Sequence, residues 1–151
     1  MIRAATAADI PSIIEIGVVL HATTAFASQP YVHEKAAAFL LELIEGQGVV
    51  FVAEVDGEVV GAMAGGIVDQ WFSHELIAYD YSIFVLPSRR NGLLALKLVR
   101  AFIEWAKIMG AAQVQMGIGT AVNVEGTGRL YESAGFRLLG PMYVQELPPC
   151  A

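Results

Sequence analysis

The hinge between two apolar segments of this sequence carries groups that can bind an anion. Residues 85–97 read VLPSRRNGLLALK, so Arg89, Arg90 and Gly92 stand between a strand-like run and a helix-like run. The first turn of a helix presents unpaired backbone N–H groups and about half a unit of positive charge. Glycine permits close backbone approach, and two guanidinium groups add forked donors. Two interpretations follow: a phosphate-binding helix start, or a loop whose arginines are merely solvated.

The apolar periodicity on either side of the hinge predicts a single mixed α and β domain over residues 1–151. Spacings of three and four predict helices, and alternating or continuous β-branched runs predict strands. The pair Asp56-Gly57 between two such runs predicts a type I′ hairpin turn. We expect strands at 1–6, in both arms of 49–68, and at 75–87, 112–119 and 136–147, and helices from Thr6 or Asp9 to His21 and at 33–45, 92–109 and 123–134.

The order of these segments predicts a mostly antiparallel sheet with one parallel strand pair, flanked by helices on both faces. A strand at 75–87, a helix at 92–109 and a strand at 112–119 follow one another, and such a unit joins parallel neighbours. The last segment, 136–147, is expected to close the chain as a strand or hairpin that turns at Gly140-Pro141.

Composition narrows the classes of partner. Hydrophobic residues make up 56% of the chain, charged residues 16%, and the net charge is −6. No uninterrupted apolar run reaches the roughly 18–20 residues of a membrane span, and no dense basic run is present, so we expect neither a membrane nor a nucleic-acid partner. The single cysteine, Cys150, cannot form an internal disulfide, and no Cys/His metal pattern occurs; we expect a cytoplasmic protein without metal. The high apolar content predicts a homodimer that buries part of this surface.

Three segments of the chain resemble one family. The opening IRAATAADIPSIIEI, the V-x-P-x-x-R of residues 85–90 and the LYESAGF of residues 130–136 are similar to the GNAT superfamily of acyl-CoA-dependent N-acetyltransferases. The likeness covers essentially the whole chain, and the predicted order of strands and helices also looks like that fold. The resemblance implies transfer of an acetyl group from acetyl-CoA to a primary amine.

The resemblance implies a CoA site at the hinge. In the family this hinge reads Arg/Gln-x-x-Gly-x-Gly/Ala, and its backbone N–H groups hold the CoA pyrophosphate. Leu93 stands where the family has a glycine, so its side chain must point away from the phosphates. The residues implied in CoA binding here are Arg90, Asn91, Gly92, Leu93, Leu94 and Ala95, together with Asn123, which resembles an asparagine that contacts CoA in many members.

Amine acetylation requires a base, because a lysine-like amine with a pKa of about 10.4 is protonated at neutral pH. Asp80 interrupts an apolar strand five residues before Val85, where the resemblance places an acidic base in some members. Glu75, near the start of the same strand, and a bound water are the alternatives. The thioester oxyanion is expected to meet a backbone N–H at Phe84 or Val85, because the parallel strands of this fold splay after the hinge.

Tyr131 is the expected general acid. In the family this tyrosine faces the CoA sulfur. A phenol of pKa about 10 is a weaker acid than a thiol near 8.5, so a strong hydrogen bond to the departing thiolate is as plausible as complete proton transfer. A tyrosine that lies on a short helix and is buried in the protein core would give the same sequence pattern.

Two functions from different classes remain open at this point. The first is an N-acetyltransferase with a small-molecule or peptide amine as acceptor, Tyr131 and Asp80 as catalytic residues and acetyl-CoA as co-substrate. The second is a sensor or interaction module that keeps the acyl-CoA site without turnover; the leucine at position 93 leaves room for it. A thiol-release assay across a panel of amines separates the two.

Overall fold

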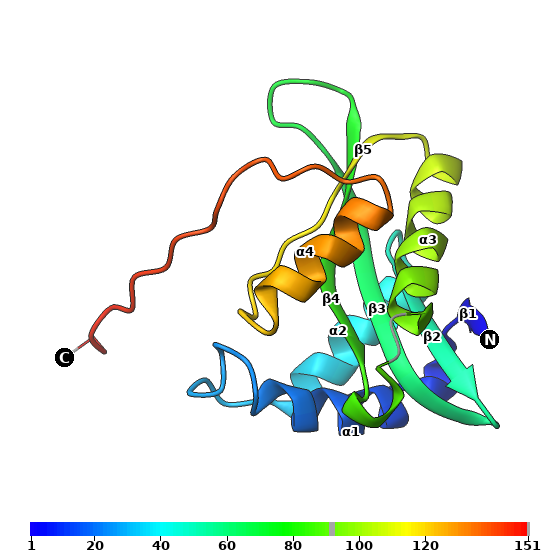
Figure 1. Cartoon of the computed structure of the whole chain (residues 1–151), viewed down its shortest axis with the longest axis vertical. Helices are drawn as coiled ribbons and strands as arrows, with labels where there is room; N and C mark the ends of the chain where they lie inside the picture. Colours follow the sequence, from blue (N-terminus) through cyan, green and yellow to red (C-terminus); the bar gives the residue numbers. More distant parts are fainter. Residues whose placement is uncertain (91–92, 151) are drawn as a thin grey trace.

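The fold is built on a five-stranded sheet whose strands lie in chain order. This computed structural model describes residues 1–90 and 93–150. The strands are β1 (Ile2–Ala4), β2 (Val49–Val55), β3 (Glu58–Asp69), β4 (Leu76–Val85) and β5 (Ala111–Gln115). All neighbours are antiparallel except β4 and β5, which are parallel (Figure 1). The expected fold class and its single parallel crossover are confirmed.

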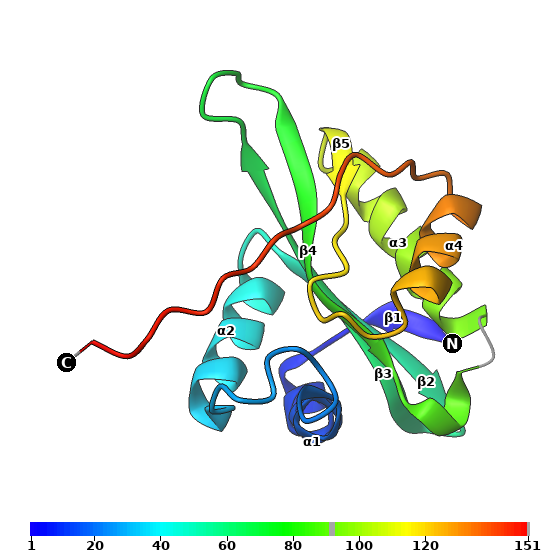
Figure 2. The ribbon, with the colours of Figure 1, turned by 60° about the vertical axis from the view of Figure 1, so that its left-hand side comes forward.

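Helices cover both faces of this sheet. After a short 3-10 turn at Ala7–Asp9, α1 (Ile10–His21) and α2 (His33–Glu45) pack on one face. The other face carries α3 (Leu93–Ile108) and α4 (Val124–Ser133), as Figure 2 shows. Side chains alternate between the two faces along each strand. Val50 and Val52 therefore pack in the core beneath α1 and α2, whereas Val49 and Ala53 pack in the core beneath α3.

A β-bulge in β4 changes this alternation. Gly65 of β3 pairs with Asp80, but Ala64 pairs with Ser82, so Tyr81 is an extra residue in β4. Ala78 before the bulge and Val85 after it both pack in the core beneath α3, although they are seven positions apart and a regular strand would place them on opposite faces. Asp80 faces α3 by alternation from Ala78. The bulge after it places Ile83 and Val85 on this same face and Phe84 on the other.

Most sequence-predicted elements are confirmed, with boundaries shifted by a few residues. In the hairpin turn, Asp56 and Gly57 have φ values of 53° and 80°, as a type I′ turn requires. The strand expected at 112–119 ends earlier, at Gln115.

The expected C-terminal strand or hairpin is wrong for the residues that the structure describes. Residues 136–150 contain no strand and run away from the sheet (Figures 1 and 2). Large apolar side chains stay exposed there; they are Leu138, Leu139, Met142, Tyr143, Val144 and Leu147. This segment has the composition of a strand, but a strand forms only when a neighbouring edge accepts its hydrogen bonds.

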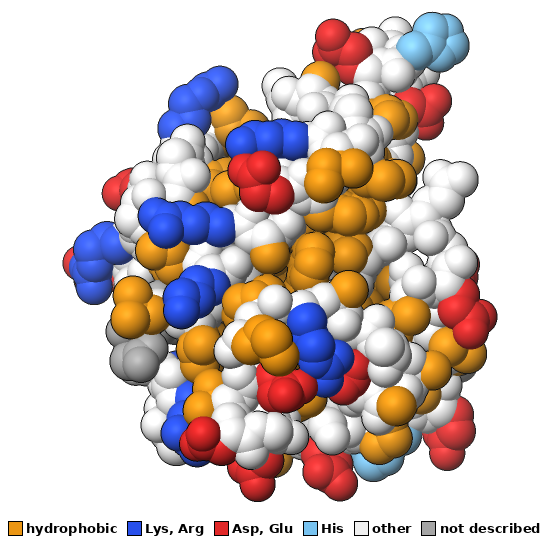
Figure 3. Space-filling view, turned by 90° about the vertical axis from the view of Figure 1, so that its right-hand side faces the viewer, with side chains coloured by type: hydrophobic (Ala, Val, Ile, Leu, Met, Phe, Trp, Pro, Cys, Tyr) orange, Lys and Arg blue, Asp and Glu red, His pale blue; other side chains and the backbone are white. Residues whose placement is uncertain are grey.

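One face of the domain also exposes apolar surface. Figure 3 shows hydrophobic side chains gathered across the middle of the face on the right of Figure 1, with Lys and Arg side chains beside them. Partly buried residues at the margin of the core contribute apolar area in this fold: Ile2, Phe51, Val55 and Trp105. In the described part of the chain, no helix combines the length and the hydropathy needed to cross a membrane.

Candidate active site

The candidate site lies where β4 and β5 diverge. The last parallel pair between these strands is Tyr79 with Gln115, so β4 continues beyond it with no β5 partner on that side. Leu86 N–H donates to the Val60 carbonyl at 2.8 Å. N–H groups alternate between the two sides of a strand, so Phe84 N–H also points toward β3, whereas Val85 N–H points away from β3. Of the two predicted oxyanion donors, Val85 is thus the one whose N–H points away from β3; its role stays a prediction.

Asp80 and Tyr131 meet at Gly117, just beyond the end of β5. The Asp80 carboxylate accepts a hydrogen bond from Gly117 N–H at 3.1 Å. The Tyr131 hydroxyl donates to the Gly117 carbonyl at 3.0 Å. The two side chains come from β4 and α4, so the fold brings together the two residues that the sequence predicted as base and acid.

The surroundings raise the pKa of both groups. Burial raises the pKa of Asp80, although hydrogen bonds from Gly117 N–H and from its own backbone N–H oppose the shift. Burial also raises the pKa of Tyr131 well above its ordinary value of 10, and the charge of Asp80 adds to that shift. Asp80 is therefore a better proton acceptor than a solvated aspartate, and Tyr131 stays a neutral phenol.

An arginine side chain of the hinge contacts the end of β4. After β4 a 3-10 turn covers Pro87–Arg89, and the Nε of Arg90 donates to the Val85 carbonyl at 2.9 Å. Arg90 thus contacts the strand that carries the predicted oxyanion donor. A cavity of about 300 Å³ lies beside this hinge, lined by Val55, Ser88, Arg89, Arg90 and Leu94.

The first turn of α3 follows at Leu93. The predicted positions Asn91 and Gly92 lie outside the described residues, whereas Leu94 and Ala95 lie in the first turn of α3. Leu93 is 60% exposed, so it is not packed in the core; its direction relative to a bound phosphate stays a prediction. Helix α3 has 16 residues, long enough for a full macrodipole at its N-terminus.

Asn123 has a structural contact in addition to its predicted role. It is the N-cap of α4, and its side chain accepts a hydrogen bond from Gly126 N–H at 3.3 Å. Its backbone lies in the left-handed region with a φ of 44°. The cap fixes the start of the helix that carries Tyr131; a contact with CoA stays a prediction.

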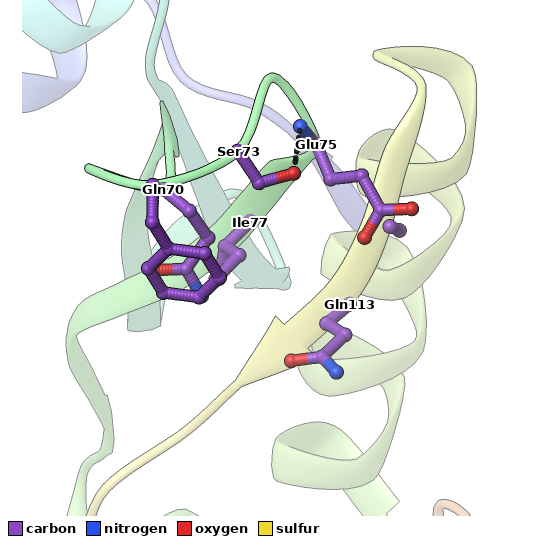
Figure 4. A pocket seen from close by; sticks show the side chains of 7 residues that line it. Gln70, Ser73, Glu75, Ile77 and Gln113 are labelled. Carbon is purple, nitrogen blue, oxygen red and sulfur yellow. Dashed lines mark hydrogen bonds between the residues drawn. The ribbon is translucent and has the colours of Figure 1, made fainter.

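Glu75, the alternative base, lies elsewhere. It lines a separate cavity of about 180 Å³ formed with Gln70, Phe72, Ser73, Ile77, Ala112 and Gln113 (Figure 4). The Glu75 N–H donates to the Ser73 hydroxyl at 3.2 Å. Five residues of strand separate Glu75 from Asp80, about 16 Å at the rise of an extended chain. The geometry therefore favours Asp80 over Glu75.

Sequence reasoning missed two parts of this site. Gly117, which holds both Asp80 and Tyr131, gives no signal because its contribution is made by backbone groups. The loop between α1 and α2 contacts the segment that follows Gly117, because Ala25 N–H donates to the Thr120 carbonyl at 2.9 Å. Only a long-range backbone contact shows that this loop borders the segment after β5.

Comparison with known proteins identifies the family. The sequence profile of the acetyltransferase (GNAT) family matches residues 18–136. This chain belongs to the GNAT acetyltransferase family. The comparison with curated protein sequences gives no match.

Solved structures with the same fold include several acetyltransferases. A putative acetyltransferase from Agrobacterium tumefaciens str. C58 is 25% identical, with a TM-score of 0.75 over 98% of this chain and 99% of that chain. An acetyltransferase from Trypanosoma brucei is 20% identical, with a TM-score of 0.74 over 97% and 99%. Glucosamine-6-phosphate N-acetyltransferase from Arabidopsis thaliana is 18% identical, with a TM-score of 0.76 over 98% of each chain. These structural matches cover 97–98% of this chain.

Proposed function

We propose that this GNAT protein is an N-acetyltransferase that moves the acetyl group of acetyl-CoA to a primary amine by direct attack. The observation that carries the proposal is the convergence of Asp80 and Tyr131 on Gly117, at the point where β4 and β5 diverge. An amine acetyltransferase needs a proton acceptor and a thiolate stabiliser close together, and these two side chains provide them.

The proposed reaction assigns one role to each group. Asp80 accepts a proton from the acceptor ammonium, directly or through a water, which frees the nitrogen lone pair. The nitrogen attacks the thioester carbonyl carbon, and Val85 N–H stabilises the negative oxygen. The C–S bond then breaks while Tyr131 donates a hydrogen bond to the departing thiolate. The nitrogen gives its second proton to this thiolate, directly or through a water, which yields the amide and the free CoA thiol, and Asp80 returns its proton to solvent. The hinge at Arg90 and the first turn of α3 would hold the CoA pyrophosphate.

The raised pKa of Tyr131 refines its role. An ordinary phenol has a pKa about 1.5 units above that of a thiol, which is near 8.5. Because the pKa of Tyr131 is raised further, hydrogen-bond donation is favoured over complete proton transfer. Part of that shift comes from the negative charge of Asp80. When Asp80 accepts the proton of the amine, this charge disappears and the Tyr131 pKa falls. Proton uptake by Asp80 therefore prepares Tyr131 to stabilise the leaving group.

The experiment is a thiol-release assay with acetyl-CoA and a panel of primary amines, in parallel with calorimetric titration of CoA. Cys150 is exposed and would react with thiol reagents, so the assay uses a Cys150→Ser variant in every arm. We expect CoA binding and amine-dependent release of free CoA. CoA binding with no turnover on any amine would instead support the sensor or interaction module.

We further propose a homodimer in the cytoplasm. The exposed apolar residues of the C-terminal segment and the hydrophobic face in Figure 3 support the homodimer, because soluble monomers rarely expose large apolar patches. Sedimentation at micromolar concentration should give twice the mass of the 16.2 kDa chain. A single species of the monomer mass would contradict the dimer without affecting the proposed reaction.

A further inference from the structure

Three aromatic rings form a corner on the face of the sheet opposite Asp80. Phe39 comes from α2, and Tyr79 and Tyr81 come from β4. The ring centroids of Phe39 and Tyr81 lie 4.7 Å apart at an interplanar angle of 87°, and those of Tyr79 and Tyr81 lie 5.1 Å apart at 74°. The two hydroxyls are 2.8 Å apart. We call these three side chains the aromatic corner.

The corner rests on a backbone floor and stays open to solvent. A Cβ added at Gly66 would lie 2.9 Å from the Tyr79 hydroxyl and 3.2 Å from the Tyr81 ring, so the rings lie directly over this glycine. Phe39 is 37% exposed and Tyr81 is 47% exposed. Core aromatics of the same domain differ sharply: Phe102, stacked on Trp105, has no exposed surface. The corner is therefore not simply part of the core.

A carboxylate borders the corner. Glu42 lies three residues after Phe39 on α2, hence on the same side of the helix. The pKa of Tyr81 is raised to about 12 by its hydrogen bond with Tyr79, by burial and by the charges of Tyr79 and Glu42. Among the ion pairs of residues 1–90 and 93–150, none involves Glu42. Electron-rich ring faces beside a carboxylate are the groups that attract an organic cation.

The position of the corner connects it to the candidate site. Tyr81 is the extra residue of the bulge and directly follows Asp80, so the two side chains lie at the same level of β4 on opposite faces. At this level β4 is no longer paired with β5. An acceptor with one amine at Asp80 and a second cationic group at the corner would have to extend past this unpaired edge of β4.

We propose that the aromatic corner, with Glu42, binds a second cationic group of the acceptor, so that the enzyme acts on diamines or on amines that carry a distal alkylammonium group. Its assignment to the acceptor depends on the acetyltransferase function proposed above. Binding of an organic cation does not depend on that function, so the two can be tested separately.

The first experiment measures binding without chemistry. Choline and its neutral isostere 3,3-dimethylbutan-1-ol are titrated into the full-length protein, and the tyrosine ring signals are followed by NMR. We expect choline to bind about 5- to 30-fold more tightly than the alcohol, the range of cation–π attraction. Equal affinities for choline and the alcohol would overturn the proposal.

Variants locate the binding. Tyr81→Leu should weaken choline about 5- to 30-fold, whereas Tyr81→Phe, which keeps the ring, should retain binding. Glu42→Gln should weaken choline about two- to fivefold, the effect of a partly solvated charge. Glu45→Gln, at the last residue of α2 and six positions after Phe39, is the matched control and should have no effect. If Glu42→Gln and Glu45→Gln behave alike, and Tyr81→Leu has no effect, the corner is not the cation site.

The second experiment measures turnover with 1,5-diaminopentane and with pentylamine. We expect a higher kcat/KM for the diamine, and Tyr81→Leu should remove this preference. Choline binding at the corner without turnover on any amine would leave the cation site in place and reject the acetyltransferase function. Turnover without a diamine preference, together with no choline binding, would reject the corner and retain the acetyltransferase function.

Discussion

Two carboxylates of this domain, Asp9 and Asp80, have opposite surroundings. Asp9 accepts two hydrogen bonds from the Arg3 guanidinium, each at 2.8 Å, and one from Thr6 N–H, also at 2.8 Å. These contacts hold the pKa of Asp9 well below its ordinary range, the Arg3 bond being the largest cause. The donors to Asp80 within residues 1–90 and 93–150 are backbone N–H groups, and burial raises its pKa. The charge of Asp9 is paired with Arg3 inside the protein, whereas Asp80 has no such partner among the described residues and binds a proton more readily.

The arginines show the same difference. Arg3 bridges Asp9 and Glu54, so its charge is fully used inside the protein. Arg90 donates instead to a neutral backbone carbonyl, and no ion pair in the described part of the chain includes it. A paired charge fixes where β1 meets α1, whereas an uncompensated charge remains available to a substrate. The comparison therefore separates charges that are matched within the fold from the unmatched charges to which we assign roles in the proposed reaction.

The largest expected effect comes from the phenol that contacts the same glycine as Asp80. Tyr131→Phe keeps the ring and removes the hydroxyl. The value of kcat should fall about 10²- to 10⁴-fold, while the affinity for acetyl-CoA hardly changes, because the hydroxyl acts mainly on the leaving thiolate. Steady-state kinetics and calorimetry measure both. Tyr143→Phe, an exposed tyrosine of the C-terminal segment, is the control and should behave as wild type. Wild-type kcat for Tyr131→Phe, with chemistry rate-limiting, would end the general-acid proposal.

Asp80→Asn should remove the proton acceptor. The value of kcat/KM at neutral pH is expected to fall about 10²- to 10³-fold, and the lost activity should not return at high salt. Thermal stability should stay the same or rise, because the fold no longer desolvates a carboxylate at this position. Glu75→Gln tests the alternative base in the same assay. If Glu75→Gln is the more damaging change, the assignment of the two carboxylates is reversed.

Arg90→Ala tests the uncompensated charge. CoA should bind about 1.5–3 kcal/mol more weakly, the scale of a charge-assisted contact. Titration calorimetry with CoA measures the change. Arg89→Ala, one position earlier on the same hinge, is the matched control and should lose less affinity. Unchanged affinity in Arg90→Ala would leave this arginine with its contact to the Val85 carbonyl alone.

The sequence predicted most of this fold because its signals are local. The glycine in the turn at Asp56-Gly57 and the apolar spacing of the long helix each depend on neighbours within a few residues. The prediction of a C-terminal strand or hairpin was wrong because its formation depends on a distant part of the chain. Residues 136–147 have strand-like composition, but pairing depends on a distant edge, and local composition cannot show whether that edge is available.

The site was predictable only in part. The pattern around the hinge and the segment LYESAGF pointed to Arg90 and Tyr131. The bulge at Tyr81 was not foreseen, because an extra residue in one strand appears only when the register with its partner is known. Gly117 was missed because it acts through its backbone. Both omissions are effects of tertiary placement, which residue type does not reveal.

Asp9→Asn tests the structural half of the comparison. It removes one carboxylate from a pair in which Arg3 is still 32% exposed, so the loss is smaller than for a fully buried ion pair. We expect the free energy of unfolding to fall by about 1–2 kcal/mol, measured by urea denaturation. Catalysis by the folded protein should not change. A loss of kcat without a loss of stability would reverse the roles assigned to the two carboxylates.

The smallest expected effect is in the pH dependence of stability, where the two carboxylates should act in opposite directions. The pKa of Asp9 is lowered by folding, so its stabilisation is complete above the unfolded value near 3.9 and is lost as the pH falls below it. The pKa of Asp80 is raised by folding, so the folded state binds this proton more tightly. Its contribution is favourable at low pH and is lost as the pH rises from about 3.9 through the folded value. Urea midpoints between pH 2 and 7 should therefore rise less steeply with pH in Asp9→Asn than in wild type, and more steeply in Asp80→Asn. Parallel curves for the two variants would show that the fold treats the two carboxylates alike.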